Sequence, residues 1–318
     1  MNVLVTGATG FVGSALVDQL AGAGVRVIGL ARSGAAGPSR RLVRSWDVKG
    51  LTEQLAGMDV VVHAASVVHR PGAPLDEYRA FNVEGTRALA AAAKACGVWR
   101  IIFLSSIKVY GEDVPNGRID ETTPPAADGG YAATKLSAER ILEQASRDGG
   151  ACVTILRLCP VFGKGDKGNV RRVLTAIARG RFILPGDGST RKSIVHVSTV
   201  AEVVRAVIEN DRSGVFVVAD RETPTMRTLA DTAAEVVGKR RPFSVPAAAL
   251  RLMALPVEVA SRALGREPPV SRALIDKSLA SSVCVVDTAE RELGVTCHVD
   301  LRGALKEEYE WLRETGEL

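Results

Sequence analysis

The stretch VLVTGATGFVG, residues 3–13, decides the fold. A short apolar run, VLV, leads directly into glycines at Gly7, Gly10 and Gly13, and FVGSALVDQLAGAG then follows with a helical pattern. This order predicts a buried strand, a tight turn and a helix that begins close to the turn. Glycines at this spacing let backbone N–H groups at the helix terminus approach a pyrophosphate. The stretch therefore predicts a dinucleotide-binding turn.

The same alternation continues through the first half of the chain. Apolar runs at 25–30, 59–64, 100–105 and 152–158 are separated by longer amphipathic stretches. Apolar strands alternating with helices are typical of a parallel sheet covered on both faces, so we expect an α/β protein with a doubly wound Rossmann sheet. We assign this domain to residues 1–163, with 194–220 returning to it. Residues 164–193 and 221–318 are expected to form a smaller α/β lobe that binds substrate.

Composition restricts the class of protein. The 318 residues are 46% hydrophobic and 24% charged, as in a globular protein of one or two domains. The five cysteines show no metal-ligand spacing, and no signal peptide precedes the first strand, which favours a reduced cytoplasmic protein without a metal site. The apolar stretches at 60–68 and 246–260 are too short to span a bilayer. We expect no membrane partner.

The charge pattern also bears on partners. The net charge is only +5, and the aromatic residues, 4% of the chain, do not interleave with the basic ones, so nucleic-acid binding is not expected. A denser basic stretch runs from Arg171 to Lys192. It is either a binding surface for an anionic small molecule or a solvated helix face.

The end of the second apolar run, GLARS (29–33), predicts the cofactor. A protein that selects NAD usually has an acid here for the ribose 2′-hydroxyl, whereas this chain has Ala31 followed by Arg32. An arginine at this point favours the 2′-phosphate of NADP. If Arg32 is merely a surface residue, NAD remains the alternative. Asp47, after the next short apolar element, is a candidate acceptor for the adenine amino group.

The segment YAATK (131–135) places Tyr131 and Lys135 on one face of a helix that should start near Gly130. The pair follows the run that ends in Ser105 and Ser106, and strand ends of parallel sheets are where ligands bind. A phenol has an ordinary pKa near 10, so it is a poor base unless a nearby cation stabilises the phenolate. Lys135 can supply that cation. Tyr131 would then exchange a proton with a substrate hydroxyl, with Ser106 bonded to the same oxygen.

Several motifs together resemble those of the extended short-chain dehydrogenase/reductases, which include NAD(P)-dependent sugar-nucleotide epimerases, dehydratases and reductases. They are TGATGFVG, HAAS (63–66), FNVEGT (81–86), SSIKVYG (105–111), YAATK, VFGKG and KSIVHV. The resemblance covers nearly the whole chain. It implies a catalytic triad of Ser106, Tyr131 and Lys135, with Asn82 supporting the lysine.

The resemblance also implies binding residues. Expected cofactor contacts are Gly7, Thr9, Gly10, Phe11, Val12, Gly13, Arg32, Asp47, Val48, Ala64, Ala65, Tyr131 and Lys135. Expected substrate contacts are His69, Lys108, Asn169, Arg191 and Lys192, of which Asn169 and Lys192 would bind the nucleotide diphosphate. His63 is expected to be structural. Relatives often dimerise through a four-helix bundle, which here would use residues 75–96 and 131–147, so a homodimer is a candidate assembly.

Departures from the family pattern restrict which of the family's reactions is expected. Sugar-nucleotide 4,6-dehydratases carry an Asp-Glu pair after the catalytic serine or threonine, and this chain has Ile107 and Lys108 instead. SSIKV is similar to the branch that reduces UDP-linked 4-keto-6-deoxyhexosamines or epimerises sugars at C4, although Val67 and Tyr110 replace that branch's arginine and asparagine. We predict an NADP-dependent reductase of a nucleotide-linked 4-keto sugar. The alternatives are a nucleotide-sugar 4-epimerase, a reductase of a non-sugar carbonyl and a non-catalytic NADP sensor.

Overall fold

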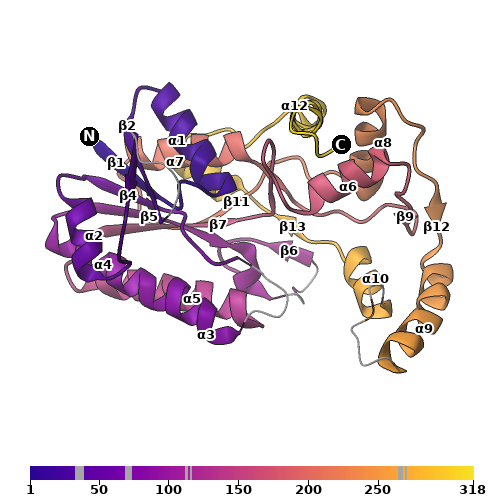
Figure 1. The fold of residues 1–318 in the computed structure, drawn as a ribbon, viewed down its shortest axis with the longest axis horizontal. Helices are drawn as coiled ribbons and strands as arrows, with labels where there is room; N and C mark the ends of the chain where they lie inside the picture. Colours follow the sequence, from indigo (N-terminus) through magenta and orange to yellow (C-terminus); the bar gives the residue numbers. More distant parts are fainter. Residues whose placement is uncertain (33–38, 69–73, 112–113, 115–116, 264–267, 269–270) are drawn as a thin grey trace.

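The structure, a computed structural model, describes residues 1–32, 39–68, 74–111, 114, 117–263, 268 and 271–318. In this part of the chain the central sheet has seven strands, all parallel, in the order β11-β7-β5-β4-β1-β2-β3 (Figure 1). The strands are β1 (Asn2–Thr6), β2 (Arg26–Ala31), β3 (Arg40–Leu42), β4 (Val60–His63), β5 (Arg100–Ser106), β7 (Cys152–Leu158) and β11 (Gly214–Val218). The predicted α/β class and Rossmann sheet are therefore confirmed.

Helices cover both faces of this sheet. Side chains of α1 (Phe11–Gly22), α7 (Val197–Glu209) and α11 (Asp287–Leu293) pack on one face. The other face is covered by α2 (Val48–Leu55), α4 (Gly85–Ala95) and α5 (Gly130–Arg147). Before α4 lie α3 (Leu75–Tyr78) and a π-helical segment, η1 (Arg79–Glu84). The chain thus buries both faces of its parallel strands, as their apolar sequences require.

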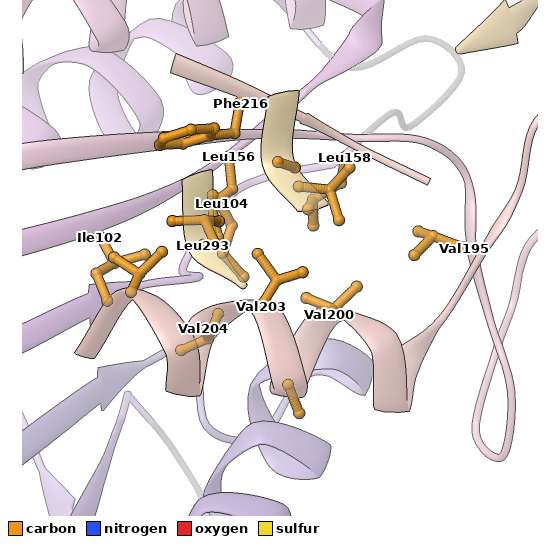
Figure 2. Packing of buried hydrophobic residues seen from close by; sticks show 14 of the residues in the cluster. Ile102, Leu104, Leu156, Leu158, Val195, Val200, Val203, Val204, Phe216 and Leu293 are labelled. Atoms are coloured by element: carbon orange, nitrogen blue, oxygen red, sulfur yellow. The ribbon is translucent and has the colours of Figure 1, made fainter. Parts of the chain in front are cut away.

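Alternate residues of β5 point to opposite faces of the sheet. Ile102 and Leu104 pack with Val200, Val203 and Val204 of α7, and Figure 2 shows these side chains meeting those of β7, β11 and α11. Their neighbours Ile101 and Phe103 belong to the second core, beneath α4 and α5. This two-sided burial fixes the strand so that its last residues, Ser105 and Ser106, emerge at the carboxyl edge of the sheet.

A smaller lobe lies beside the carboxyl edge (Figure 1). Its core joins α6 (Asn169–Ala178), α8 (Met226–Val236) and α12 (Leu301–Glu314). Short elements complete the chain: η2 (Ile107–Tyr110), β6 (Arg118–Ile119), β8 (Val161–Phe162), β9 (Leu184–Pro185), β10 (Val195–His196), β12 (Ser244–Val245), α9 (Ala247–Ala263), α10 (Arg272–Leu279) and β13 (Val283–Cys284). Since α7 packs on the sheet and β11 pairs with β7, we propose the division into a Rossmann domain, 1–163 with 194–220, and a substrate lobe.

The glycine turn after β1 is held by close backbone contacts. Gly7 has a φ of +70°, and a Cβ there would lie 2.8 Å from the backbone nitrogen of Ala65. A Cβ on Gly13 would lie 2.2 Å from the carbonyl oxygen of Gly7. The turn therefore packs directly against both the first helical turn and the segment after β4. Neither position has room for a side chain.

We predict that Gly13→Ala lowers the free energy of unfolding by about 1–3 kcal/mol, because the methyl group overlaps backbone that cannot move without opening the turn. Gly22→Ala is the matched control at the other end of α1. Apart from its chain neighbours and the backbone of its own helix, no heavy atom of the described residues lies within 4 Å of a Cβ at Gly22, and alanine is the better helix former. Urea unfolding measures both variants, and equal stability of the two would contradict the prediction.

Candidate active site

Three neighbouring strands end together at the candidate site. The register of the sheet sets Thr6 beside His63, and His63 beside Phe103. The His63 ring lies 2.9 Å from the Thr6 hydroxyl through Nδ1 and 3.1 Å from the Thr86 hydroxyl through Nε2. Burial lowers the pKa of His63 to about 3, so the ring is neutral. His63 is thus a structural link between β1, β4 and α4, as the sequence predicts.

Ser106 and Tyr131 meet just beyond the end of β5. Ser106 is the N-cap of η2, and its hydroxyl accepts a bond of 3.3 Å from the backbone N–H of Lys108. Tyr131 lies in the first turn of α5, and its phenol is hydrogen-bonded to the Ser106 side chain. Burial raises the pKa of Tyr131 to about 12, and the bond to Ser106 opposes this shift only in part. The phenol is therefore protonated at neutral pH and can act as a proton donor.

Lys135 lies one helical turn after Tyr131, inside the protein. Its Nζ donates a bond of 2.8 Å to the Leu104 carbonyl and lies 4.6 Å from the centre of the Phe103 ring. Burial lowers the pKa of Lys135 to about 7, while the negative charge of Glu139 opposes that shift. An amine with this pKa is near its charge transition at neutral pH. Its charge can therefore respond to what binds beside it.

Behind Lys135 lies a buried ionic network that the sequence analysis missed. Glu139 forms a 2.7 Å salt bridge with Arg157 of β7 and also accepts from the Ser105 hydroxyl. Arg157 donates a further bond of 2.9 Å to the Tyr110 hydroxyl. Tyr110, the departure from the family pattern, is thus part of the core. The sequence contains one signal that Glu139 lies near the site. Glu139 follows Lys135 at the same four-residue spacing that separates Tyr131 from Lys135, so all three lie on one face of the helix.

Asn82 connects the segment after β4 to α5. Its amide oxygen accepts from the Val67 N–H at 2.8 Å, and its amide nitrogen donates to the Val67 carbonyl at 3.0 Å. The same nitrogen donates to the Thr134 hydroxyl at 3.2 Å, between Tyr131 and Lys135 on the helix. These bonds hold the HAAS segment against the catalytic helix. The geometry assigns Asn82 a positioning role.

The glycine turn, α1 and the HAAS segment fit a nucleotide phosphate. Gly10 is the N-cap of α1, and among the described residues no side chain caps this helix, so its first N–H groups face the carboxyl edge of the sheet. The predicted contacts Thr9, Phe11 and Val12 lie in the turn and the first helical turn. Ala64 and Ala65 face the turn, within 3.0 Å of a Cβ built on Gly7. A side chain in place of Gly7 would therefore fill the glycine cradle, which is the space between the turn after β1 and the HAAS segment.

The ends of β2 and β3 place the residues predicted for the adenosine half. Arg32 is exposed directly after β2, with its guanidinium 4.2 Å from the centre of the Phe81 ring. Asp47 is the N-cap of α2 and accepts from the Gly50 N–H at 2.8 Å, a bond that holds the pKa of its carboxyl below the ordinary value. Val48 begins that helix and is exposed. The sequence analysis did not foresee the capping role of Asp47.

The predicted substrate residues are distributed over the end of β5 and the smaller lobe. Lys108 lies in η2, two residues after Ser106, and Asn169 begins α6. Arg191 lines a cavity of about 360 Å³ beside Arg221 and Thr225, whereas the Lys192 amine donates 2.8 Å to the Lys277 carbonyl in α10. The two neighbours thus lie in different surroundings. His69 lies outside the described residues.

Comparisons with known proteins agree with this geometry. The family model described as "NAD dependent epimerase/dehydratase family" matches residues 3–219. The N-acetyl-alpha-D-glucosaminyl-diphospho-ditrans,octacis-undecaprenol 4-epimerase of Escherichia coli O157:H7 is 29% identical over 287 residues, 88% of this chain and 86% of that protein. The 4-hydroxy-2-methyl-3-oxo-4-farnesyl-3,4-dihydroquinoline-1-oxide ketoreductase of Stigmatella aurantiaca is 30% identical over 311 residues, 92% of this chain and 91% of the relative.

A solved structure extends the likeness to three dimensions. MoeE5 in complex with UDP-glucose and NAD superposes with a TM-score of 0.77 at 28% identity, and the match covers 99% of each chain. The matched family region contains the glycine turn, Ser106, Tyr131 and Lys135. The chain therefore belongs to the NAD dependent epimerase/dehydratase family, within the extended short-chain dehydrogenase/reductases, and is an enzyme of the NAD(P)-dependent oxidoreductase or epimerase type.

Proposed function

We propose that this enzyme uses NADPH to reduce a keto group at C4 of a sugar linked to a diphosphate, of the UDP-4-keto-6-deoxyhexosamine type. The observation that carries the proposal is the hydrogen-bonded pair of Ser106 and Tyr131, with Lys135 buried beside it at the edge where the glycine cradle opens. Because burial keeps the Tyr131 phenol protonated, the pair is prepared to donate a proton. Proton donation is what a carbonyl oxygen requires when it becomes a hydroxyl.

Each residue of the site has a defined part in this reaction. When bound, the nicotinamide cofactor supplies the hydride. Tyr131 transfers its proton to the carbonyl oxygen, and the Ser106 hydroxyl stabilises the charge that develops on that oxygen. The Lys135 ammonium favours the phenolate that Tyr131 becomes. Asn82 holds the HAAS segment in position, and the negative charge of Glu139 raises the pKa of Lys135 against the effect of burial.

Two kinds of observation support a substrate in which the sugar is linked to a diphosphate: the ligands or substrates for which two relatives are named, and the residues of the smaller lobe. The Escherichia coli relative is named for a sugar on a diphospho-undecaprenol, and MoeE5 binds UDP-glucose, so a sugar diphosphate is common to both. Asn169 at the start of α6 is the candidate contact in this chain, because helix N-termini attract phosphate. Lys192, whose amine lies at the Lys277 carbonyl of α10, is a second candidate.

Arg32 favours reduction with NADPH over epimerisation. A reductase must exchange its cofactor in every turnover, so selection of NADPH from the cellular pool benefits it, whereas an epimerase regenerates its bound cofactor. The guanidinium of Arg32 is held over Phe81 at the end of β2, where the sequence pattern places the 2′-phosphate. A 4-epimerase is the second candidate, because the Escherichia coli relative is named as one.

The two reactions are separated by one experiment. The purified enzyme is mixed with NADPH and a UDP-4-keto-6-deoxy-N-acetylhexosamine, and the absorbance of reduced nicotinamide is followed. We expect stoichiometric loss of NADPH and a product with a hydroxyl at C4. Firmly bound NAD, together with interconversion of UDP-N-acetylglucosamine and its C4 epimer without net absorbance change, would establish the epimerase instead. Turnover confined to non-sugar ketones would reject both.

Tyr131→Phe tests the proton donor. The change removes one hydroxyl and leaves the buried ring, so we expect cofactor affinity to be retained and turnover to fall about 10²- to 10⁴-fold. Tyr309→Phe in α12 is the matched control, which should keep normal turnover. Steady-state kinetics and NADPH fluorescence titration measure the two quantities. Normal turnover of the Tyr131 variant would remove the phenol from the mechanism.

The pKa of Lys135 predicts a pH dependence of cofactor binding. Because this pKa is lowered to about 7, the amine loses its proton as pH rises through that value in the free enzyme. If the charged form binds the cofactor better, affinity is full below pH 7 and falls by up to about tenfold per pH unit above it. NADPH titrations from about pH 6 to about pH 9, on both sides of this pKa, measure the effect. Lys135→Met should show no such slope, and an equal slope in both proteins would contradict the assignment.

Arg32→Ala tests the cofactor preference. A charged hydrogen bond to the 2′-phosphate contributes about 1.5–3 kcal/mol, so the variant should lose an NADPH preference of about ten- to a hundredfold. Arg26→Ala is the control, since Arg26 is exposed at the opposite end of the same strand. The ratio of the Kd values for NADPH and NADH is measured for each. An unchanged ratio in Arg32→Ala would leave this arginine without a role in selectivity.

A further inference from the structure

Residues 239–280 are here called the basic segment, and their described part, 239–263, 268 and 271–280, lies at the end of the molecule remote from the sheet. They contain β12, α9 and α10, and Figure 1 shows α9 at the far end from the amino terminus. In the described part of the chain, α9 packs chiefly against α10. One long face of α9 is therefore left without a covering element.

The exposed face of α9 is apolar. Ala248, Leu252, Leu255 and Val259 follow one another at spacings of four, three and four residues, which places them in one stripe along the helix. All four are exposed, Leu252 to 72% and Val259 to 60%. In the described residues, the basic segment holds six of the twelve exposed large apolar side chains, at Phe243, Leu252, Met253, Leu255, Val259 and Leu274.

The covered side of α9, by contrast, combines a small apolar residue, Ala254 at 2% exposure, with a buried carboxylate. Glu258 is only 6% exposed, accepts a bond of 2.6 Å from the Arg272 backbone N–H and forms a 3.0 Å salt bridge with the Arg272 side chain. Arg251 pairs with Asp276 of α10 at 2.6 Å. A helix at a water-facing surface normally has the opposite arrangement. The polarity of α9 therefore suits an apolar environment outside the protein.

The net positive charge of the chain also resides in the basic segment. By sequence it has eight basic and three acidic residues, a net charge of +5, which equals the formal net charge of all 318 residues. The remainder of the chain has 33 basic and 33 acidic residues, obtained by difference, and is neutral. Lys239, Arg240 and Arg241 are exposed just before β12. Apolar exposure and positive charge thus coincide in one segment.

We propose that the stripe of α9 docks on the surface of a membrane that contains anionic lipids. Apolar side chains that enter the boundary of the acyl chains, together with basic residues near the headgroups, are the features that hold interfacial helices. A second copy of the chain fits less well, because two segments of the same positive charge would be brought together. Among the described residues, no helix is both long enough and apolar enough to cross a membrane. The helix would lie in the plane of the membrane surface.

The position of α10 connects this surface to the candidate site. The Lys192 amine donates to the Lys277 carbonyl of α10, and α10 is the element on which α9 rests. A substrate bound near Lys192 would thus lie beside the docked face. The docking itself follows from α9 and its charges and holds whichever reaction the enzyme performs.

The test is co-sedimentation of the full chain with vesicles. We expect binding to vesicles of phosphatidylglycerol and phosphatidylcholine, weaker binding to phosphatidylcholine alone, and a decline as salt is raised. Leu252→Gln combined with Val259→Gln should lower the apparent affinity about tenfold or more, because two apolar side chains no longer enter the lipid. Lys239→Gln combined with Arg240→Gln should reduce the preference for the anionic vesicles.

Ile183→Gln is the matched control, since this residue is exposed to 43% outside the basic segment and should not alter vesicle binding. All changes are at exposed positions, so unchanged thermal unfolding and NADPH binding verify that each variant folds. Absence of vesicle binding by the unaltered chain would overturn the proposal, as would equal binding by the Leu252 and Val259 double variant. A dimer in solution that the double variant dissolves would also overturn it and assign the face to a second copy.

Discussion

Backbone contact between the glycine turn and the segment after β4 is the constraint on which the candidate site depends. A side chain at Gly7 would overlap Ala65, and one at Gly13 would overlap Gly7 itself. Thr6 strengthens this contact, because its hydroxyl accepts a bond of 3.0 Å from the Ala65 N–H. The start of α1, the end of β1 and the HAAS segment are thus joined as one unit. The uncapped N–H groups of α1 are held at the carboxyl edge as a consequence.

The catalytic helix is fixed to the sheet by a different kind of interaction. Glu139 and Arg157 are both buried, and their salt bridge spans α5 and β7. Replacing such a pair with apolar residues is often neutral for stability, whereas breaking it leaves an unpaired buried charge. We infer that the pair is retained for position and charge, because Glu139 also raises the pKa of Lys135 against the effect of burial. Without that carboxylate the buried amine would be neutral over a wider pH range.

Much of the fold was accessible from the sequence because strands buried on both faces are apolar throughout. β1, β2, β4, β5 and β7 all fall on predicted apolar runs, and α5 begins at Gly130 as expected. The edge strand β3, Arg40–Leu42, is indicated only as a short apolar element before Asp47, since a short half-exposed strand has little apolar sequence to mark it. The ends of the strands also predicted which polar residues gather, and the bond between Ser106 and Tyr131 is an example.

What the sequence could not give were contacts between residues far apart in the chain. Arg157 lies within a run that reads as an ordinary strand, and only the fold shows that it meets Glu139 and Tyr110. Arg191 and Lys192 are both predicted from the sequence as substrate contacts, yet an extended backbone points adjacent side chains in opposite directions, toward α8 and α10 respectively. Adjacent charges in an extended segment do not define a single binding surface.

For helix α9, the sequence alone does not determine which face is buried. The stretch 246–260 is too short to span a bilayer, and from this length the sequence predicts no membrane partner. Periodicity alone gives two faces, one apolar and one polar, and the usual assumption is that the apolar face is the buried one. Here the Glu258 face is covered by α10 and the Leu252 face is exposed. Only the tertiary structure distinguishes a helix that contributes to a core from one that presents an apolar stripe outward, and an outward stripe suits contact with a membrane surface.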